Sequence, residues 1–323
     1  MVPRVSVIVP TWNHKEMLGD CLYSLETQTY DAMEIVVVDD GSTDGTAEFV
    51  HLYFPGVRVI RQEKNRGFCA AVNAGIRSAA TEYIILLNND MTVHSKFVAW
   101  LVSAADSSNA ALFAPLVLFR DDLTYIYCAG DMQLRNGRPE SIGYRSFESG
   151  FQEPDEIFGV SAGAALYRRE VFEQVGLFDE RFHAYFEDSD FNFRARLAGF
   201  TAKFVRAALA YHVGSASLEG RTWWRSRQCY RNHALLVLKN FPLPVLIRNA
   251  PGILMERFNQ TSRLLSSARA EFGLARALCI LMKTWLSMMT AIPHCLAERR
   301  RIQRSRKISI PELNRLLDMA EEP

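Results

Sequence analysis

Carboxylate and amide side chains gather in three short segments of this 323-residue sequence. Asp39–Ser42 and Asn88–Asp90 each follow a run of apolar residues, and His183–Asp190 ends in three acids within four positions. Oxygen-rich clusters of this kind can accept a hydrogen bond from a nucleic base, hold a hard divalent cation or remove a proton from a substrate. Each segment therefore has a chemical interpretation to weigh against a structural one.

The first cluster can recognise a nucleic base. The Asp39 carboxylate is purely an acceptor, so it can accept the N3–H of a uracil or thymine ring. The same residues also suit an Asx-turn at the start of a helix. The residues alone leave both interpretations open.

The second cluster suits a divalent cation that also holds diphosphate oxygens. Magnesium takes only one or two protein carboxylates together with water and phosphate, so Asp90 beside the Asn88 and Asn89 amides can suffice. An ordinary turn is the alternative, because Asn and Asp are frequent in turns. His212, which closes a later apolar run, is either a core histidine or a further metal ligand, and the acids favour the ligand.

The third cluster can supply a general base. Glu187, Asp188 and Asp190 precede a segment of helical periodicity, where Asp188 or Ser189 would make a good N-cap. Three acids exceed what capping requires. Like charges in one pocket raise a pKa, which is the usual preparation of a base.

Alternating strand and helix patterns place the first two clusters at one edge of a sheet. Such alternation implies a mainly parallel sheet, in which ligands bind beyond the carboxyl ends of the strands. The predicted strands are Val5–Val9, Glu34–Val38, Val57–Arg61 and Tyr83–Leu87. Three helices are predicted between them. The first buries Leu18, Cys21, Leu22 and Leu25, the second is capped by Thr43 and Asp44, and the third spans Ala70–Ala80. The later predicted elements are strands at Val160–Tyr167 and Phe204–Val213, helices at Arg169–Val175 and Ser189–Ala198, and a helical region from Trp223 onward.

The whole-chain composition indicates a folded protein without a global field for nucleic acid. The net charge is +1, with 49% hydrophobic and 23% charged residues. Six scattered cysteines argue against a zinc site and a disulfide framework and favour a reducing compartment. The apolar run at the N-terminus is too short for a signal peptide and is interrupted by Pro10, so we expect a cytoplasmic protein.

Six segments resemble, in the same order, the family 2 glycosyltransferases with the GT-A fold, especially the bacterial rhamnosyltransferase-like branch. They are VSVIVPTWNHKEMLGDCLYSLETQTY, EIVVVDDGSTDGT, NRGFCAAVNAGI, YIILLNND, the stretch Val160–Phe200 and YHVGSAS, followed by the less specific TWWRSRQCYRNHALLVLKNFP. The resemblance implies an α/β GT-A fold, with a mainly parallel Rossmann-like sheet, helices on both faces and a helical C-terminal extension. It assigns residues 1–105 to nucleotide-sugar binding, 106–217 to the acceptor-binding and catalytic half of the same domain, and 218–323 to the extension.

Carried over position by position, the resemblance implies a base, a metal site and a set of substrate contacts. Asp188 matches the catalytic base, while Asp90 and His212 would hold Mg²⁺ or Mn²⁺. Asn88 stands where the family has the first acid of D-x-D, so Asp90 is the main carboxylate on the metal. The implied substrate-binding residues are Pro10, Thr11, Asn13, Asp39, Asp40, Ser42, Gly67, Asn73, Asn88, Asn89, Gly163 and Glu187.

The implied function is inverting transfer of a sugar from a UDP- or dTDP-sugar to a hydroxyl of a glycan or lipid-linked glycan. Cell-surface polysaccharide or glycolipid assembly at the cytosolic membrane face is the expected setting. A nicotinamide-dependent Rossmann enzyme is excluded, because the turn Thr11–Lys15 lacks G-x-G-x-x-G. A catalytically silent nucleotide-sugar-binding subunit of a polysaccharide-assembly complex is the alternative, which the intact Asp90 and Asp188 disfavour.

The C-terminal region carries a membrane hypothesis. Its apolar stretches, such as Ala234–Val237 and Ala277–Met282, are interrupted by cations, and none reaches the roughly 20 uninterrupted residues of a spanning helix. We therefore predict no transmembrane segment. A basic run over Arg299–Lys307 follows, which suits amphipathic helices lying on an anionic membrane. A helical hairpin packed on the domain, or a homodimer contact, is the alternative.

Overall fold

The computed structural model describes residues 2–213 and 222–319, and the chain folds into two compact units. The first comprises Met1–Asp131, Ser141–His183 and Phe200–Ala216, and the second Met132–Glu140, Ala184–Gly199 and Ser217–Pro323. This division differs from the predicted one, because residues 184–199 group with the C-terminal helices. The predicted boundary at 217 and the last four residues of YHVGSAS lie outside the described residues.

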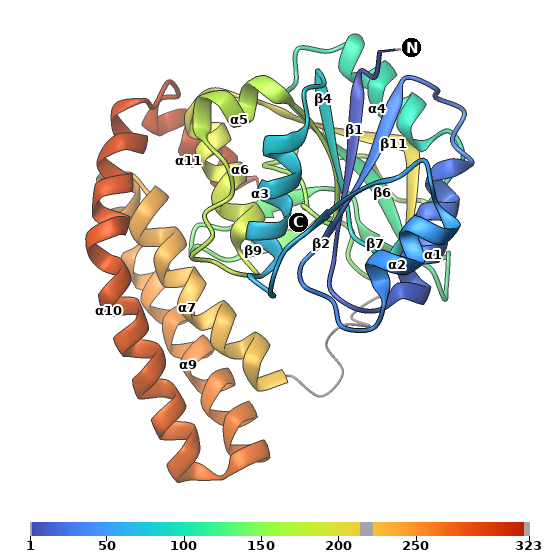
Figure 1. The fold of residues 1–323 in the computed structure, drawn as a ribbon. Coiled ribbons are helices and arrows are strands. Elements are labelled where there is room, and N and C mark those ends of the chain that lie inside the picture. Colours follow the sequence, from blue (N-terminus) through green and yellow to red (C-terminus); the bar gives the residue numbers. More distant parts are fainter. Residues whose placement is uncertain (1, 214–221, 320–323) are drawn as a thin grey trace. The chain divides into compact units, whose positions relative to one another are not determined.

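A nine-stranded sheet forms the centre of the first unit, in the order β3-β2-β1-β4-β10-β6-β11-β5, with β7 paired to β6. Its strands are β1 (Val5–Thr11), β2 (Met33–Asp39), β3 (Arg58–Arg61), β4 (Tyr83–Leu87), β5 (Met91–Val93), β6 (Leu112–Phe119), β7 (Ile126–Cys128), β10 (Ala164–Arg168) and β11 (Ala202–His212). The first four in this order are parallel, β10 runs antiparallel between β4 and β6, and β6 and β11 are parallel again. The predicted mainly parallel α/β sheet is confirmed, and Figure 1 shows its parallel strands β1, β2 and β4. The strands β5, β7 and β10 are antiparallel to their neighbours.

Helices cover both faces of this sheet because successive strand side chains point to opposite sides. Val5, Val7 and Val9 pack in one core with Leu18 and Leu22 of α1 (Lys15–Glu26). α4 (Phe97–Asp106) contributes to the same core. The other helices of this unit are α2 (Thr46–Tyr53), α3 (Phe68–Ser78) and α5 (Arg169–Val175).

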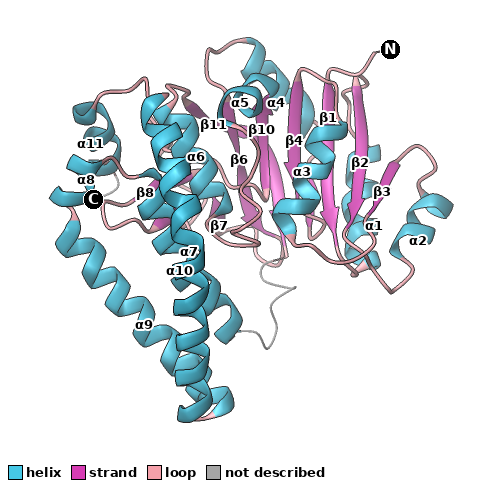
Figure 2. Cartoon of the chain, turned by 60° about the vertical axis from the view of Figure 1, so that its left-hand side comes forward, coloured by secondary structure: helices cyan, strands magenta, loops and turns pink. Residues whose placement is uncertain are grey.

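The opposite face of β1 is covered by α3, which Figure 2 shows lying across the sheet. The approach is close, because a Cβ added at Gly75 would lie 2.4 Å from Cγ2 of Ile8. Burial of both faces is the physical reason for the uninterrupted apolar runs at β1, β2 and β4.

Helices dominate the second unit. They are α6 (Glu187–Leu197), α7 (Thr222–Asn240), α8 (Leu243–Arg248), α9 (Ala250–Phe272), α10 (Leu274–Arg304) and α11 (Ile310–Asp318). α7, α9 and α10 pack along one another around Tyr230, Leu264 and Met288 (Figure 1). α6 packs on α7, where the rings of Phe193 and Phe241 lie 4.9 Å apart. A short hairpin of β8 (Asp131–Gln133) and β9 (Pro139–Ser141) precedes these helices in the chain.

Local signals located most elements but not all of their ends. The strand Tyr83–Leu87 and the helix Arg169–Val175 have the predicted bounds. The predicted strand Val160–Tyr167 pairs regularly only from Ala164 onward.

The helix caps predicted in two places are wrong. The N-caps of α2 and α6 are Gly45 and Phe186, both with left-handed backbone and neither with a side-chain cap. Asp44 still accepts hydrogen bonds from N and Oγ1 of Thr46, so it stabilises the first turn of α2 without capping it.

The C-terminal apolar stretch is longer than the sequence pattern indicated. α10 runs continuously for 31 residues, and by length and composition alone it could cross a membrane. The prediction of no spanning segment rested on uninterrupted apolar length, whereas a helix can carry isolated cations within an apolar stretch. Only 22% of its most apolar 18-residue window is buried, so the exposed side of this helix needs an explanation.

Candidate active site

The carboxyl ends of three neighbouring strands bring the first two polar clusters together. Thr11 ends β1 in register with Asp39 at the end of β2, and β4, on the other side of β1, ends just before Asn88. Nδ2 of Asn89 donates to Oγ1 of Thr11 at 2.8 Å, and N of Asn88 donates to the carbonyl oxygen of Gly163 at 2.8 Å. Segments nearly 80 residues apart in sequence thus share one edge of the sheet.

Asp39 combines both interpretations of the first cluster. Its Oδ1 accepts a hydrogen bond from N of Ser42 at 2.8 Å, as an Asx-turn requires. Its Oδ2 is buried, accepts no hydrogen bond from the described part of the chain and lies 3.6 Å from Nε of Arg61. A buried acceptor without a donor costs free energy, so a ligand N–H placed here would be stabilised.

Asp40 has a different task. Its two carboxylate oxygens accept hydrogen bonds from N of Arg66 and N of Gly67, each at 2.8 Å. Burial raises the pKa of Asp40, and the two N–H donors lower it in part. Asp40 therefore holds the loop before α3, and its part in substrate binding stays a prediction. Gly67 has φ +92°, and a Cβ there would lie 2.2 Å from Nδ1 of His183, so no larger residue fits.

The turn after β1 is held by the side chains of Asn13 and Ser42. N of Asn13 donates to Oγ of Ser42 at 2.7 Å, and Oδ1 of Asn13 accepts from N of Thr43 at 3.0 Å. Asn13 and His14 both have φ 60°, which is uncommon outside glycine and marks a functional turn when the surroundings enforce it. Pro10 lies within β1, opposite Val38.

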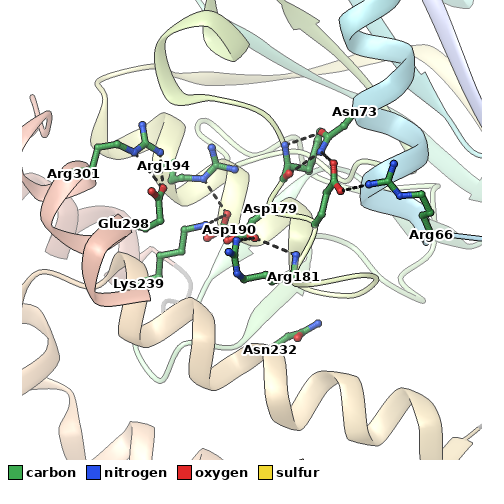
Figure 3. A network of polar contacts seen from close by, with 12 residues as sticks. Arg66, Asn73, Asp179, Arg181, Asp190, Arg194, Asn232, Lys239, Glu298 and Arg301 are labelled. Atoms are coloured by element: carbon green, nitrogen blue, oxygen red, sulfur yellow. Dashed lines mark hydrogen bonds and ion pairs between the residues drawn. The ribbon is translucent and has the colours of Figure 1, made fainter. Parts of the chain in front are cut away.

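Asn73 is committed to the protein itself. Its Nδ2 donates to the carbonyl oxygen of Phe178 at 2.9 Å, and its Oδ1 accepts from N of Phe178 at 3.0 Å (Figure 3). Glu180 continues this loop and pairs with Arg66 at 3.1 Å. Asn73 therefore positions this loop, and its predicted contact with the nucleotide stays a prediction.

Asp90 and His212 come together because of strand pairing. Met91 starts β5 in register with His212, the last residue of β11. Nε2 of His212 lies 3.2 Å from Oδ2 of Asp90, and the ring of Tyr127 packs against the imidazole with centroids 4.2 Å apart. Oδ1 of Asp90 and Nδ1 of His212 are buried, and neither has a hydrogen-bond partner among residues 2–213 and 222–319.

This pair fits a divalent cation that is completed by other oxygens. Residues 2–213 and 222–319 contain no group of three or more His, Cys, Asp or Glu arranged for a metal. One carboxylate and one imidazole, together with water and phosphate oxygens, nevertheless meet the needs of Mg²⁺ or Mn²⁺. The partnerless Oδ1 of Asp90 supports this fit, since a buried carboxylate oxygen requires a donor or a cation.

In the second unit, the acidic cluster separates into different environments. Asp190 is fully buried and accepts hydrogen bonds from Nε of Arg194 at 2.9 Å and Nζ of Lys239 at 2.9 Å (Figure 3). It also accepts one from Nδ2 of Asn240 at 2.8 Å. The expectation that three acids crowd one pocket is therefore wrong for Asp190. Two cations compensate its charge, which gives it a structural role.

Glu187 and Asp188 remain as neighbouring acids. Glu187 is 8% exposed, and no residue that the structure describes makes a hydrogen bond with its Oε2. Burial, and then the charge of Asp188, raises the pKa of Glu187 to about 8, so Glu187 is mostly protonated at neutral pH. Asp188 is less buried, and its Oδ1 accepts a hydrogen bond from N of Ser189 at 2.7 Å. Asp188 is thus the more accessible carboxylate of the two.

Asn232 of α7 holds the loop that leads into α6. Its Nδ2 donates to the carbonyl oxygens of Ala184 at 3.0 Å and Tyr185 at 2.8 Å. Tyr185 and Phe186 have φ 66° and 69°, a strained backbone for aromatic residues. The sequence analysis missed this role. The available signal was the pair Asn232 and Lys239, two polar residues at heptad spacing on one face of α7.

Lys239→Met is expected to lower the free energy of unfolding by about 3 kcal/mol, because it removes a cation from a buried carboxylate. Chemical denaturation at neutral pH measures this, with Lys203→Met at an exposed position as the matched control. Adding Asp190→Asn to Lys239→Met should recover part of the loss. Equal stability of the two lysine variants would show that the buried pair contributes nothing.

Residues 6–176 match the protein family described as glycosyl transferase family 2. The N-acetylglucosaminyl-diphospho-decaprenol L-rhamnosyltransferase of Mycobacterium tuberculosis is 27% identical over 238 residues, covering 66% of this chain and 76% of that protein. Glycosyltransferase GlyG of Streptococcus pneumoniae is 35% identical over 113 residues, covering 34% of this chain and 38% of that protein. The chain spans about a third to just over half of the length of several curated relatives that it matches.

Among solved structures, the mannosyltransferase PcManGT from Pyrobaculum calidifontis, in complex with GDP-Man and Mn²⁺, is similar to this chain. The TM-score is 0.57 at 18% identity, with 94% of this chain and 86% of that chain covered. At this identity the likeness concerns the fold, and it confirms the predicted GT-A architecture.

Proposed function

Because the chain belongs to glycosyl transferase family 2, we propose that it transfers a sugar from a UDP- or dTDP-sugar to an acceptor hydroxyl with inversion at the anomeric carbon. One observation carries the proposal. At a single edge of the sheet, Oδ2 of Asp39 and Oδ1 of Asp90 are buried and accept no hydrogen bond from the described residues. A base could donate to Asp39, and Asp90 lies beside His212. The neighbouring side chains of Thr11 and Ser42 already take part in hydrogen bonds within the protein.

Asp39 would bind the nucleotide through its second oxygen. Oδ1 is held by the backbone of Ser42, which fixes the carboxylate plane, and Oδ2 would accept the N3–H of uracil or thymine. Thr11, Asn13 and Ser42 shape the adjoining turns, and the Asp40 carboxylate positions the backbone at Gly67. This arrangement treats uracil and thymine alike.

Asp90 and His212 would hold a divalent cation, with Asn88 and Asn89 beside them. Such a cation supplies charge neutralisation for the leaving diphosphate. The Asp90 carboxylate and the His212 imidazole are held together by the pairing of β5 with β11. With Asn88 in place of a second acid, the protein contributes one carboxylate, which favours modest metal affinity.

Asp188 is proposed as the general base. It would take the proton of the acceptor hydroxyl while that oxygen bonds to the anomeric carbon and the bond from this carbon to the diphosphate oxygen breaks. The nucleoside diphosphate leaves, and the proton remains on Asp188. The pairing of Asp190 with Lys239 and the raised pKa of Glu187 support the choice of Asp188 among the three acids.

The proposed acceptor is a glycan or lipid-linked glycan of cell-surface polysaccharide or glycolipid assembly, at the cytosolic face of a membrane. The name of the M. tuberculosis relative specifies an acceptor of the lipid-diphosphate-linked sugar type, which supports this class. Donor choice and acceptor use can be tested together. UDP- and dTDP-sugars are screened by thermal shift with Mg²⁺ or Mn²⁺, and nucleoside diphosphate release is then followed with and without a polyprenyl-diphosphate-linked sugar.

We expect one donor class to raise the melting temperature only with metal, and acceptor to accelerate nucleoside diphosphate release. Binding of a donor without any turnover, in the presence of a panel of acceptors, would instead indicate a catalytically silent nucleotide-sugar-binding subunit. Failure of every UDP- and dTDP-sugar to bind would contradict the role of Asp39.

A further inference from the structure

α10 carries a continuous apolar stripe on its exposed side. Seven large apolar residues on this helix are between 40% and 73% exposed: Leu274, Leu278, Met282, Trp285, Leu286, Met289 and Leu296. With about 100° of rotation per residue, they fall within a sector of roughly 120°. Scattered apolar residues are normal on protein surfaces, but a stripe along one side of a long helix indicates a binding surface.

The other side of α10 is packed within the second unit. Ala277, Thr284, Met288, Ala291 and Cys295 are buried there. Polar groups of α7 reach this side, since Nε of Arg227 donates to Oγ1 of Thr284 at 3.2 Å and Nε of Arg231 donates to Oγ of Ser287 at 3.0 Å. The stripe is therefore the free side of a helix that is fixed on its other side.

The charges on α10 are almost all positive. The helix contains six cations and one acid, Glu298, which pairs with Arg301 at 2.8 Å. By rotation angle, Arg276 and Lys283 border the stripe on one side, and Arg300 and Arg304 continue it toward the C-terminal end. All four are exposed. Long cationic side chains beside an apolar stripe can reach anionic headgroups while their stems lie on apolar surface.

We propose that α10 lies in the plane of an anionic membrane, with its apolar stripe in the interfacial region and its cations on lipid headgroups. Apolar area and electrostatic attraction add in such binding, with each cation contributing most when salt is low. The inference does not depend on the sugar donor or the base. It identifies the surface by which the protein would reach a lipid-linked acceptor.

The packing of α10 argues against a spanning helix. A helix that crosses a bilayer alone is apolar on all sides, whereas α10 has one side bound to Arg227 and Arg231 of α7. Crossing would take these arginines into the hydrocarbon or break the helix pairs. The charge argues equally against a second copy of the chain. A two-fold pairing of α10 would bring together two helices that each carry six cations and one acid, with four of those cations beside or along the apolar stripe.

Vesicle flotation with the full chain tests the proposal. We expect binding to phosphatidylcholine vesicles that contain phosphatidylglycerol, weaker binding at high salt and little binding to phosphatidylcholine alone. The double variant Met282→Glu/Leu286→Glu should reduce the bound fraction about tenfold or more. Leu52→Glu/Leu123→Glu, at two exposed apolar positions of the first unit, is the matched control and should bind like wild type.

Four results would overturn the proposal. Two of them are failure of the wild-type chain to float with anionic vesicles at low salt and flotation of the stripe variant to the same extent as the control. Resistance of the bound protein to alkaline extraction would indicate a spanning helix. A wild-type dimer in light scattering that the stripe variant converts to a monomer, without any vesicle binding, would assign the stripe to a second copy. A circular dichroism melt of both variants checks that they are folded.

Discussion

Asp188→Asn is expected to lower turnover by about two orders of magnitude or more and to leave donor affinity unchanged, since general base catalysis typically contributes about 10²–10⁴ in rate. The amide keeps the shape of the carboxylate and still accepts the hydrogen bond from N of Ser189 through its carbonyl oxygen. It cannot take a proton from the acceptor hydroxyl. Steady-state nucleoside diphosphate release measures the rate, and calorimetric titration of the donor measures affinity.

Glu187→Gln is the matched control for this variant. If Glu187 is protonated at neutral pH, the amide resembles its native state, so turnover at pH 7 should change little. The stability effect has a defined sign. The pKa of Glu187 is about 8 in the folded chain and ordinarily 4.5, so between these values the unfolded chain loses its proton while the folded chain keeps it, and wild type loses stability as pH rises. Glu187→Gln should therefore match wild type near pH 4 and exceed its stability at pH 8.

Three results would contradict the assignment of the base. Near-normal turnover of a folded Asp188→Asn variant would exclude Asp188. A loss of equal size in Glu187→Gln would indicate that the proton is handled by Glu187 instead. A loss of donor affinity in Asp188→Asn would show that its role is binding, because only the transition state is affected when a base is removed.

Removal of divalent metal is expected to abolish turnover, and Mg²⁺ or Mn²⁺ should restore it. The proposed metal stabilises charge on the leaving diphosphate by several kcal/mol, so Asp90→Ala should reduce turnover by about 10²-fold or more. A readout independent of activity is the thermal shift induced by Mn²⁺ together with the nucleoside diphosphate. This shift should be present in wild type and lost in Asp90→Ala and His212→Ala.

Asn88→Asp offers a test in the opposite direction. It restores the first acid of the D-x-D pattern and adds a carboxylate beside the proposed cation, so half-maximal activity should need less metal. Asp31→Ala removes an exposed carboxylate just before β2, at the opposite end of that strand from Asp39, and should leave metal dependence unchanged. Full activity of wild type in excess chelator would refute the metal site, and Asp90→Ala should then be nearly harmless.

The first unit shows how much of a site can be inferred from sequence. Leu18, Cys21, Leu22 and Leu25 are the buried residues of α1, as their helical spacing predicted. The polar clusters after β1, β2 and β4 meet at one edge because parallel neighbouring strands must end on the same side. Periodicity and strand direction are local properties, so they can be read without coordinates.

The individual oxygens could not be inferred in this way. Asp39 and Asp40 are adjacent acids in the same turn, yet both oxygens of Asp40 are taken by backbone N–H groups while Asp39 keeps one without a donor. The difference depends on where the loop at Arg66 and Gly67 folds back. A sequence motif identifies acids that can bind, but the number of unused lone pairs depends on the tertiary contacts.

By itself, the sequence determined the strand–helix alternation, the sheet edge at which the site lies and the family resemblance. These follow from side-chain periodicity and from residue types within short segments. Only the tertiary structure decided which acid of the third cluster is structural. Lys239 lies 49 residues from Asp190, and no local pattern shows that its ammonium group neutralises that carboxylate. Electrostatic environment depends on distance in space and on burial, and chain folding sets both through contacts between segments that are remote in sequence.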